Sequence, residues 1–143
     1  MTLIRFWYYK KNYECIYDLI CYQSNSVSEF NIYLVTGICQ VLNISTSLYS
    51  SSSFSINKTS TERLIAIVKS VKGDIYLSGL GGDKYQDINL FNEHNIELRY
   101  NEFEHPEYRQ LKSDTFIFGL SILDLIFHLG LDETKLIISN YRI

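Results

Sequence analysis

In the first part of the chain, apolar side chains recur every three or four positions in two separate stretches. This spacing places them on one face of a helix, so we expect an amphipathic helix over Tyr8–Cys21 and a second over Ser28–Leu42. The aromatic stripe of the first helix indicates core packing rather than a cofactor site. Ser26 or Ser28 is expected to cap the second helix, because a serine hydroxyl accepts a hydrogen bond from a first-turn amide.

The segment that follows is rich in serine and threonine. Its weak alternation predicts a short strand near Ser47–Ser50 and then a loop. Thr59 and Glu62 have the spacing of a capping box, which predicts a helix over Ser60–Val71. Gly73 is expected to end that helix at the position that favours glycine.

Extended and helical patterns then alternate. We expect a buried strand over Asp74–Ser78, a glycine-rich turn over Gly79–Gly82, a helix over Asp87–Asn95 and a strand over Ile96–Tyr100. This order is typical of an α/β fold with a short parallel sheet flanked by helices. The chain is expected to be helical at both ends.

The last third begins with a predicted loop, because Pro106 disfavours helical geometry at the residue before it. An apolar helix is expected over Leu120–Leu129, closed by Gly130. A final short helix is expected over Asp132–Ile138, with Asp132 as its N-cap.

Composition favours a single folded domain over residues 1–143. The chain is 46% hydrophobic and 20% charged, which supplies enough apolar surface for one core. Its net charge of −3 argues against binding to nucleic acid or to anionic membranes, which call for clustered Lys and Arg. We therefore expect no nucleic-acid partner.

Several features point to the cytoplasm. No apolar run approaches the roughly 20 residues of a membrane span, and the first residues do not have the pattern of a secretory signal. Cys15, Cys21 and Cys39 are odd in number and lack CxxC spacing, so we interpret them as reduced core residues. No metal site is expected, and no cofactor can be named.

Four separated motifs carry a resemblance to a known family. They are Thr61-Glu62-Arg63-Leu64-Ile65, Tyr76-Leu77-Ser78-Gly79-Leu80-Gly81-Gly82-Asp83-Lys84-Tyr85, Tyr108-Arg109-Gln110-Leu111 and Leu120-Ser121-Ile122-Leu123-Asp124-Leu125-Ile126-Phe127. In order and spacing they resemble the WbqC-like family over roughly residues 27–130. Two departures stand out: Phe118-Gly119 replaces a Pro-Asn pair, and His128 replaces an asparagine.

The resemblance implies a role in O-antigen, lipopolysaccharide or other surface-glycan biosynthesis. The implied chemistry is transfer of a group onto a nucleotide-linked amino sugar, whose nucleotide sugar would be the ligand. The amino-terminal His-x-Pro-x-Tyr-x-Pro motif of full-length members does not precede Trp7. The chain thus resembles a truncated, carboxy-terminal part of such a protein, and no catalytic residues are carried over.

The strand-to-glycine turn is the first candidate site. Its residues are Ser78, Gly79, Gly81, Gly82, Lys84 and Tyr85. Glycines let a backbone approach an anion, and amides at the start of the following helix attract phosphate or carboxylate. Lys84 would add a counter-charge and Tyr85 a stacking face or hydroxyl. The alternative is a structural turn that needs positive φ.

Asp124 and His105 are further candidates. Asp124 lies in an otherwise apolar helix, so it either faces solvent or anchors a neighbouring loop. His105, between Glu104 and Pro106, could act as a general acid, a general base or a metal ligand, although a solvated loop histidine is the more common case. His94 and His128 are interpreted as structural residues near helix ends.

Three hypotheses follow. The chain is part of a sugar-nucleotide-modifying enzyme, a non-catalytic remnant or binding module that keeps the anion-binding turn, or an interaction protein. In the third case an apolar surface would mediate a homodimer or bind a partner that supplies the missing half.

Overall fold

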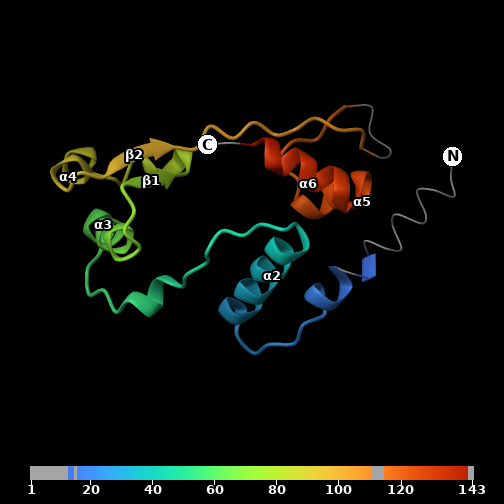
Figure 1. Ribbon diagram of the computed structural model, residues 1–143, viewed down its shortest axis with the longest axis horizontal. Coiled ribbons are helices and arrows are strands. Elements are labelled where there is room, and N and C mark those ends of the chain that lie inside the picture. Colours follow the sequence, from blue (N-terminus) through green and yellow to red (C-terminus); the bar gives the residue numbers. More distant parts are fainter. Residues whose placement is uncertain (1–12, 15, 111–114, 142–143) are drawn as a thin grey trace, which may run out of the picture. The chain divides into compact units, whose positions relative to one another are not determined.

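The computed structural model describes residues 13–14, 16–110 and 115–141, which form two compact units. We call Leu48–Glu104 the α/β unit, and Met1–Ser47 with His105–Ile143 the helical unit. Figure 1 shows the elements of both. The expected α/β class, with a short parallel sheet, flanking helices and helices at both ends, is confirmed. The single domain stays a prediction.

The sheet of the α/β unit is a parallel pair of strands, β1 (Ile75–Ser78) and β2 (Glu97–Tyr100). The short helix α4 (Ile88–Glu93) lies in the crossover that joins them, as expected for a parallel connection. The turn after β1 includes the 3₁₀ helix η2 (Leu80–Gly82). The carboxyl ends of β1 and β2 therefore meet at one edge, where Ser78 pairs with Tyr100.

Helix α3 (Ser60–Ser70) and α4 pack on the same face of this sheet. The buried core of the unit consists of Ile65, Val68, Phe91 and Ile96, and Leu64, Tyr76, Leu90 and Leu98 pack against it. Tyr76 and Phe91 stack with ring centroids 5.4 Å apart. Because side chains alternate across a strand, the neighbouring Ile75 and Leu77 face outward and are 40% and 36% exposed.

The helical unit joins segments from both ends of the chain. Residues 16–20 are helical, followed by α2 (Val27–Val41), and α5 (Ile122–Leu129) and α6 (Leu131–Asn140) come from the carboxy-terminal end. Ile16, Leu42 and Ile126 form the buried core. Residues 8–12 and 15 of the first predicted helix lie outside the described residues.

One predicted element is wrong. The structure has no strand over Ser47–Ser50 and instead forms a 3₁₀ helix, η1 (Ser51–Phe54). The Ser53 hydroxyl donates to the Ser50 carbonyl at 2.7 Å, and the Ser50 and Ser52 hydroxyls lie 2.7 Å apart. Serine side chains here satisfy the local polar groups without a partner strand.

Three predicted helix-end details also differ. Thr59 is the N-cap of α3, but its side chain makes no cap hydrogen bond. Lys72, with φ 57°, takes the left-handed position expected of Gly73. Helix α6 begins at Leu131 after Gly130, so Asp132 lies in its first turn and is not its cap. Ser26 does cap α2, as expected.

Candidate functional site

The glycine turn starts at the carboxyl-terminal edge of the parallel pair. Ser78 ends β1 and is only 5% exposed, and its carbonyl accepts a 2.7 Å hydrogen bond from the amide of Asn101, just beyond β2. Gly79 then leaves the sheet with φ −70° and ψ 154°. This edge is where ligands bind in open α/β sheets, because the loops that follow the strands converge there.

Positive φ does not explain the glycines of the turn. Gly79, Gly81 and Gly82 all lack it, and the described glycines with positive φ are Gly119 and Gly130. A Cβ built on Gly79 or Gly81 would meet no atom within 4 Å. The backbone at these two positions is therefore open to an approaching group, whereas the structural interpretation based on positive φ is wrong.

Gly82 is needed for close packing. A Cβ at this position would collide with Ser78 Oγ and lie 2.6 Å from Gln86 Nε2. The Gln86 amide donates to Ser78 Oγ at 2.8 Å, and that hydroxyl donates to the Gly79 carbonyl at 3.1 Å. Ser78 is thus a buried hydrogen-bonding residue beneath the turn, held by Gln86.

Gln86 carries an unusual feature of this turn. Its Oε1 atom is buried and has no hydrogen-bond partner among the described residues. A buried acceptor without a donor is unfavourable, since it has lost its hydration. The polar cluster beneath the turn is therefore incompletely satisfied.

Lys84 and Tyr85 follow the glycines on the surface. Both are exposed, and Tyr85 is 79% exposed. The Tyr85 amide donates to the Gly82 carbonyl at 3.0 Å, which fixes the backbone of this part of the turn. An ammonium group and an aromatic ring are thus exposed within a few residues of the open glycines.

The start of α4 does not provide the anion site that the sequence suggested. The Asp87 carboxylate accepts hydrogen bonds from the amides of Asn89 and Leu90 at 3.0 and 3.3 Å. A carboxylate already occupies these amides and would repel a phosphate. The Asp87 amide donates to buried Thr61 Oγ1 at 3.1 Å, which fastens α3 to the end of the turn.

Asp124 anchors a loop, the second of its two expected roles. It lies in α5 and accepts a 2.6 Å hydrogen bond from the Tyr108 hydroxyl. Burial, followed by this hydrogen bond to a carboxylate, raises the pKa of Tyr108 above its ordinary value. His128, one turn later in α5, places Nδ1 3.4 Å from Asp124 Oδ1 and 2.8 Å from its carbonyl oxygen.

His105 lies in the loop between β2 and α5 and is exposed. It makes at least one interaction with its surroundings. Within the described part of the chain, no group of three His, Cys, Asp or Glu side chains is arranged to hold a metal ion. A role for His105 in acid–base chemistry stays a prediction.

The structure divides the predicted site residues between the two units. Ser78 to Tyr85 form one continuous turn in the α/β unit, whereas His105 and Asp124 belong to the helical unit. Sequence reasoning missed Gln86, Thr61 and Tyr108 as supporting residues, whereas His128 was expected to have a structural role. Tyr108 and Thr61 lay within the family motifs, but their partners are 16 and 26 positions away.

Comparisons with known proteins assign this chain to a protein family. The sequence profile of the WbqC-like protein family matches residues 4–136. The uncharacterized protein Rv1507c of Mycobacterium tuberculosis (strain ATCC 25618 / H37Rv) is 33% identical over 110 residues, which are 76% of this chain and 47% of that protein. The chain therefore spans about half the length of this curated relative. No solved structure is significantly similar to it.

Within the described residues, none of the helices has both the length and the apolar character needed to cross a membrane.

Proposed function

Because the chain belongs to the WbqC-like protein family, we propose that it acts in surface-polysaccharide biosynthesis of the O-antigen type. In this proposal the turn from Gly79 to Tyr85 binds the phosphates of a nucleotide-linked amino sugar. The observation that carries the proposal is the open backbone at Gly79 and Gly81, located at the carboxyl end of a parallel strand.

The charges near the turn define how a phosphate would bind. Asp87 caps α4, so the anion would contact the turn backbone and the Lys84 ammonium rather than the helix amides. The exposed ring of Tyr85 would stack on the base or cover the sugar. These groups bind and orient a ligand without performing chemistry on it.

Group transfer onto the bound sugar would need further residues. Since the chain spans about half the length of its relative, the proposal assigns the reacting groups to a segment equivalent to the other half. The alternative, a binding module without catalysis, uses the same turn in the same way. Ligand binding is therefore the property to test first.

The test is a thermal-shift panel of nucleotides and nucleotide-linked amino sugars. A ligand at a hundred times its Kd stabilises the folded state by about 2.7 kcal/mol, which is readily detected. We expect stabilisation by at least one nucleotide sugar, and its loss in Gly81→Val and Lys84→Gln. Lys69→Gln, which removes an exposed charge from α3 of the same unit, is the matched control and should leave the response unchanged.

Two results would contradict the proposal. One is a cooperative melt with no response to any member of the panel. The other is stabilisation that persists in both Gly81→Val and Lys84→Gln, which would place the ligand elsewhere on the chain.

A further inference from the structure

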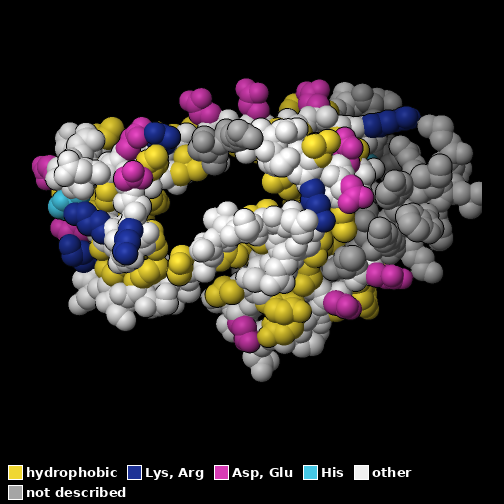
Figure 2. Space-filling model, viewed as in Figure 1, with side chains coloured by type: hydrophobic (Ala, Val, Ile, Leu, Met, Phe, Trp, Pro, Cys, Tyr) yellow, Lys and Arg dark blue, Asp and Glu magenta, His cyan; other side chains and the backbone are white. Residues whose placement is uncertain are grey.

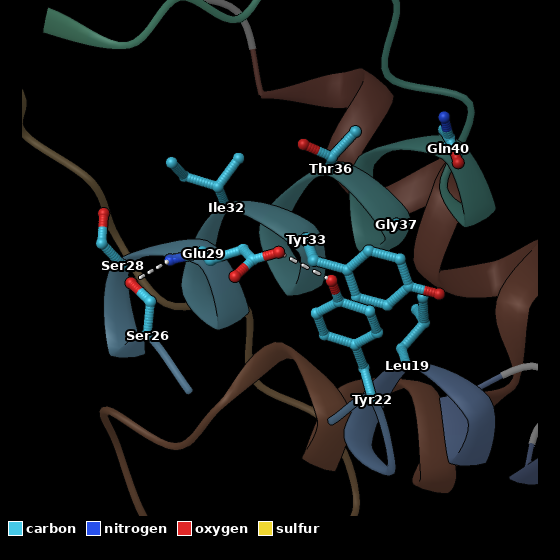
Figure 3. Close-up of a pocket in the computed structure, with 10 residues that line it drawn as sticks. All are labelled: Leu19, Tyr22, Ser26, Ser28, Glu29, Ile32, Tyr33, Thr36, Gly37 and Gln40. Carbon is cyan, nitrogen blue, oxygen red and sulfur yellow. Dashed lines mark hydrogen bonds between the residues drawn. The ribbon is translucent and has the colours of Figure 1, made fainter. Parts of the chain in front are cut away.

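A groove runs along one face of α2, entirely within the helical unit. Its volume is about 660 Å³, in the range of small-molecule sites. Its lining residues are Leu19, Tyr22, Ser26, Ser28, Glu29, Ile32, Tyr33, Thr36, Gly37 and Gln40. The α2 members recur at helical spacing, and Leu19 and Tyr22 face them from the preceding segment (Figure 3). In Figure 2, apolar side chains are visible on the surface over α2.

Gly37 lets the two segments pack closely at the base of the groove. It is buried, and a Cβ there would collide with Leu19 Cδ2 and lie 3.0 Å from Leu19 Cδ1. Ile32 lies on the same face and is 53% exposed. The base is therefore apolar, and its shape depends on the absence of one side chain.

Two tyrosines form an aromatic wall. The rings of Tyr22 and Tyr33 stack with centroids 3.9 Å apart and an interplanar angle of 19°. Figure 3 shows the Tyr22 hydroxyl pointing to Glu29. Ring faces carry negative potential and attract cations.

Glu29 is a carboxylate held in place by neutral donors. It accepts from Ser24 Oγ at 2.7 Å and from the Tyr22 hydroxyl at 3.0 Å, while its amide donates to Ser26 Oγ. The hydrogen bond from Ser24, followed by that from Tyr22, lowers the pKa of Glu29 below its ordinary value. The side chain is therefore ionised at neutral pH.

The charge of Glu29 has no counter-charge within the described part of the chain. Ion pairs there involve other carboxylates, those of Glu62, Glu97 and Asp124. Among the described residues that line the groove, none is Lys, Arg or His. The groove thus combines a fixed negative charge, electron-rich rings and an apolar base.

We propose that this groove binds a small organic ligand carrying a protonated amino group, with the ammonium between Glu29 and the Tyr22–Tyr33 pair. An ammonium satisfies the carboxylate and interacts with the ring faces, while the body of the ligand contacts Ile32 and Leu19. Anionic ligands are repelled, because Glu29 is the one charged residue among the described lining residues and it is negative. This site is independent of the glycine turn, which requires an anion.

The amino group could be carried by an apolar ring or by a sugar, and paired probes distinguish these sources. The experiment titrates the full chain with cyclohexylamine against cyclohexanol, and with glucosamine against glucose, at pH 6 and followed by NMR of the backbone amides. We expect an amine to bind more tightly than its matched alcohol, with shifts centred on residues of the groove. A preference for cyclohexylamine or for glucosamine shows whether the amino group is carried by an apolar ring or by a sugar.

Glu29→Gln is the decisive variant, because it keeps a hydrogen-bond acceptor for Tyr22 and removes the charge. We expect amine affinity to fall roughly three- to tenfold, the magnitude of an exposed ion pair together with a cation–π contact. Affinity for the alcohols should not change. Glu133→Gln, an exposed carboxylate in the first turn of α6, is the matched control and should bind the amines normally.

A second measurement keeps the proposal falsifiable if Glu29→Gln does not fold. In the native chain, amine affinity should weaken as the pH falls through the pKa of Glu29, while alcohol binding stays constant. Equal affinity for amine and alcohol, no amide shifts in the groove, or an amine preference that survives Glu29→Gln would each overturn the proposal.

Discussion

Gly81 and Gly82 are neighbours in the sequence but have different surroundings. Gly81 has open space where a Cβ would be, whereas Gly82 abuts the Ser78 hydroxyl and the Gln86 amide. Both are glycines in the same motif, so their residue type alone does not separate a binding position from a packing position. The tertiary contacts of Ser78 and Gln86 make that distinction.

Gly82→Ala should therefore be destabilising. The added methyl group would separate Gln86 from Ser78 and leave buried polar groups without partners, which costs roughly 1–3 kcal/mol. Gly81→Ala should change the free energy of unfolding by no more than about 0.5 kcal/mol. Urea denaturation of both variants measures the difference, and equal stabilities would show that the turn does not pack as described.

Tyr108→Phe tests the anchor on Asp124. Loss of the 2.6 Å hydrogen bond to a partly exposed carboxylate should lower the free energy of unfolding by roughly 1–2 kcal/mol at neutral pH. Tyr49→Phe, at a tyrosine that is 66% exposed, is the control and should have little effect.

The hydrogen bond of Tyr108 also predicts that the difference in stability between the native protein and Tyr108→Phe depends on pH. Because the pKa of Tyr108 is raised in the folded state, its stabilising contribution is complete below the ordinary tyrosine pKa of about 10. The contribution is lost as the pH rises through the raised pKa. The stability difference between the native protein and Tyr108→Phe should therefore shrink above about pH 10. A difference that stays constant there would show that Tyr108 does not titrate as expected.

At the scale of elements, periodicity predicted helices better than it predicted their ends. The second, third and fourth predicted helices occur as α2, α3 and α4, with bounds within about two residues of those expected. Caps depend on the orientation of one side chain, and here Ser26 makes its cap hydrogen bond while Thr59 does not. Serine and threonine have similar preferences for the N-cap position, yet only Ser26 of these two residues makes the cap hydrogen bond.

Ser26→Ala and Thr59→Ala form a matched pair on this point. We expect Ser26→Ala to cost roughly 0.5–2 kcal/mol, the usual value of a side-chain N-cap, and Thr59→Ala to cost less. The free energy of unfolding, measured by circular dichroism in urea, tests both. An equal loss in the two variants would indicate that Thr59 also caps α3 in solution.

At the scale of the molecule, apolar side chains are exposed in both units. Val27 is 78% exposed in the helical unit and Leu80 66% in the α/β unit, and Ile75 and Leu77 on one sheet face are 40% and 36% exposed. Extended apolar surface on a folded protein often marks an interaction site. A homodimer, or a partner that supplies the other half of a full-length relative, would cover such surface.

Self-association is the simpler of these two proposals to test. The mass measured by light scattering should rise with protein concentration, because burial of apolar surface drives association. Val27→Ser, Leu77→Thr and Leu80→Ser identify the surface involved, since a variant at the interface lowers the mass at a given concentration. A monomeric mass at all concentrations would count against a homodimer and leave the partner to be sought separately.

The sequence by itself determined the helix faces, the α/β order, the family motifs and the place of the glycine turn. These depend on local geometry, since residues three or four apart share a helix face and alternate residues share a strand face. The sequence also placed the charged residue Asp124 within an apolar helix, where its carboxylate must either face solvent or bind a neighbouring loop.

Only the tertiary structure decided which residues meet. Tyr108 reaches Asp124, Gln86 fastens Ser78, Asp87 occupies the amides of α4, and Leu19 packs on Gly37 beside the groove on α2. Apart from the Asp87 cap, which is local, each contact joins residues that no local period relates, so it depends on how the elements pack. For this reason the sequence identified the candidate turn, whereas the structure showed that the Asp87 carboxylate already occupies the first amides of the following helix.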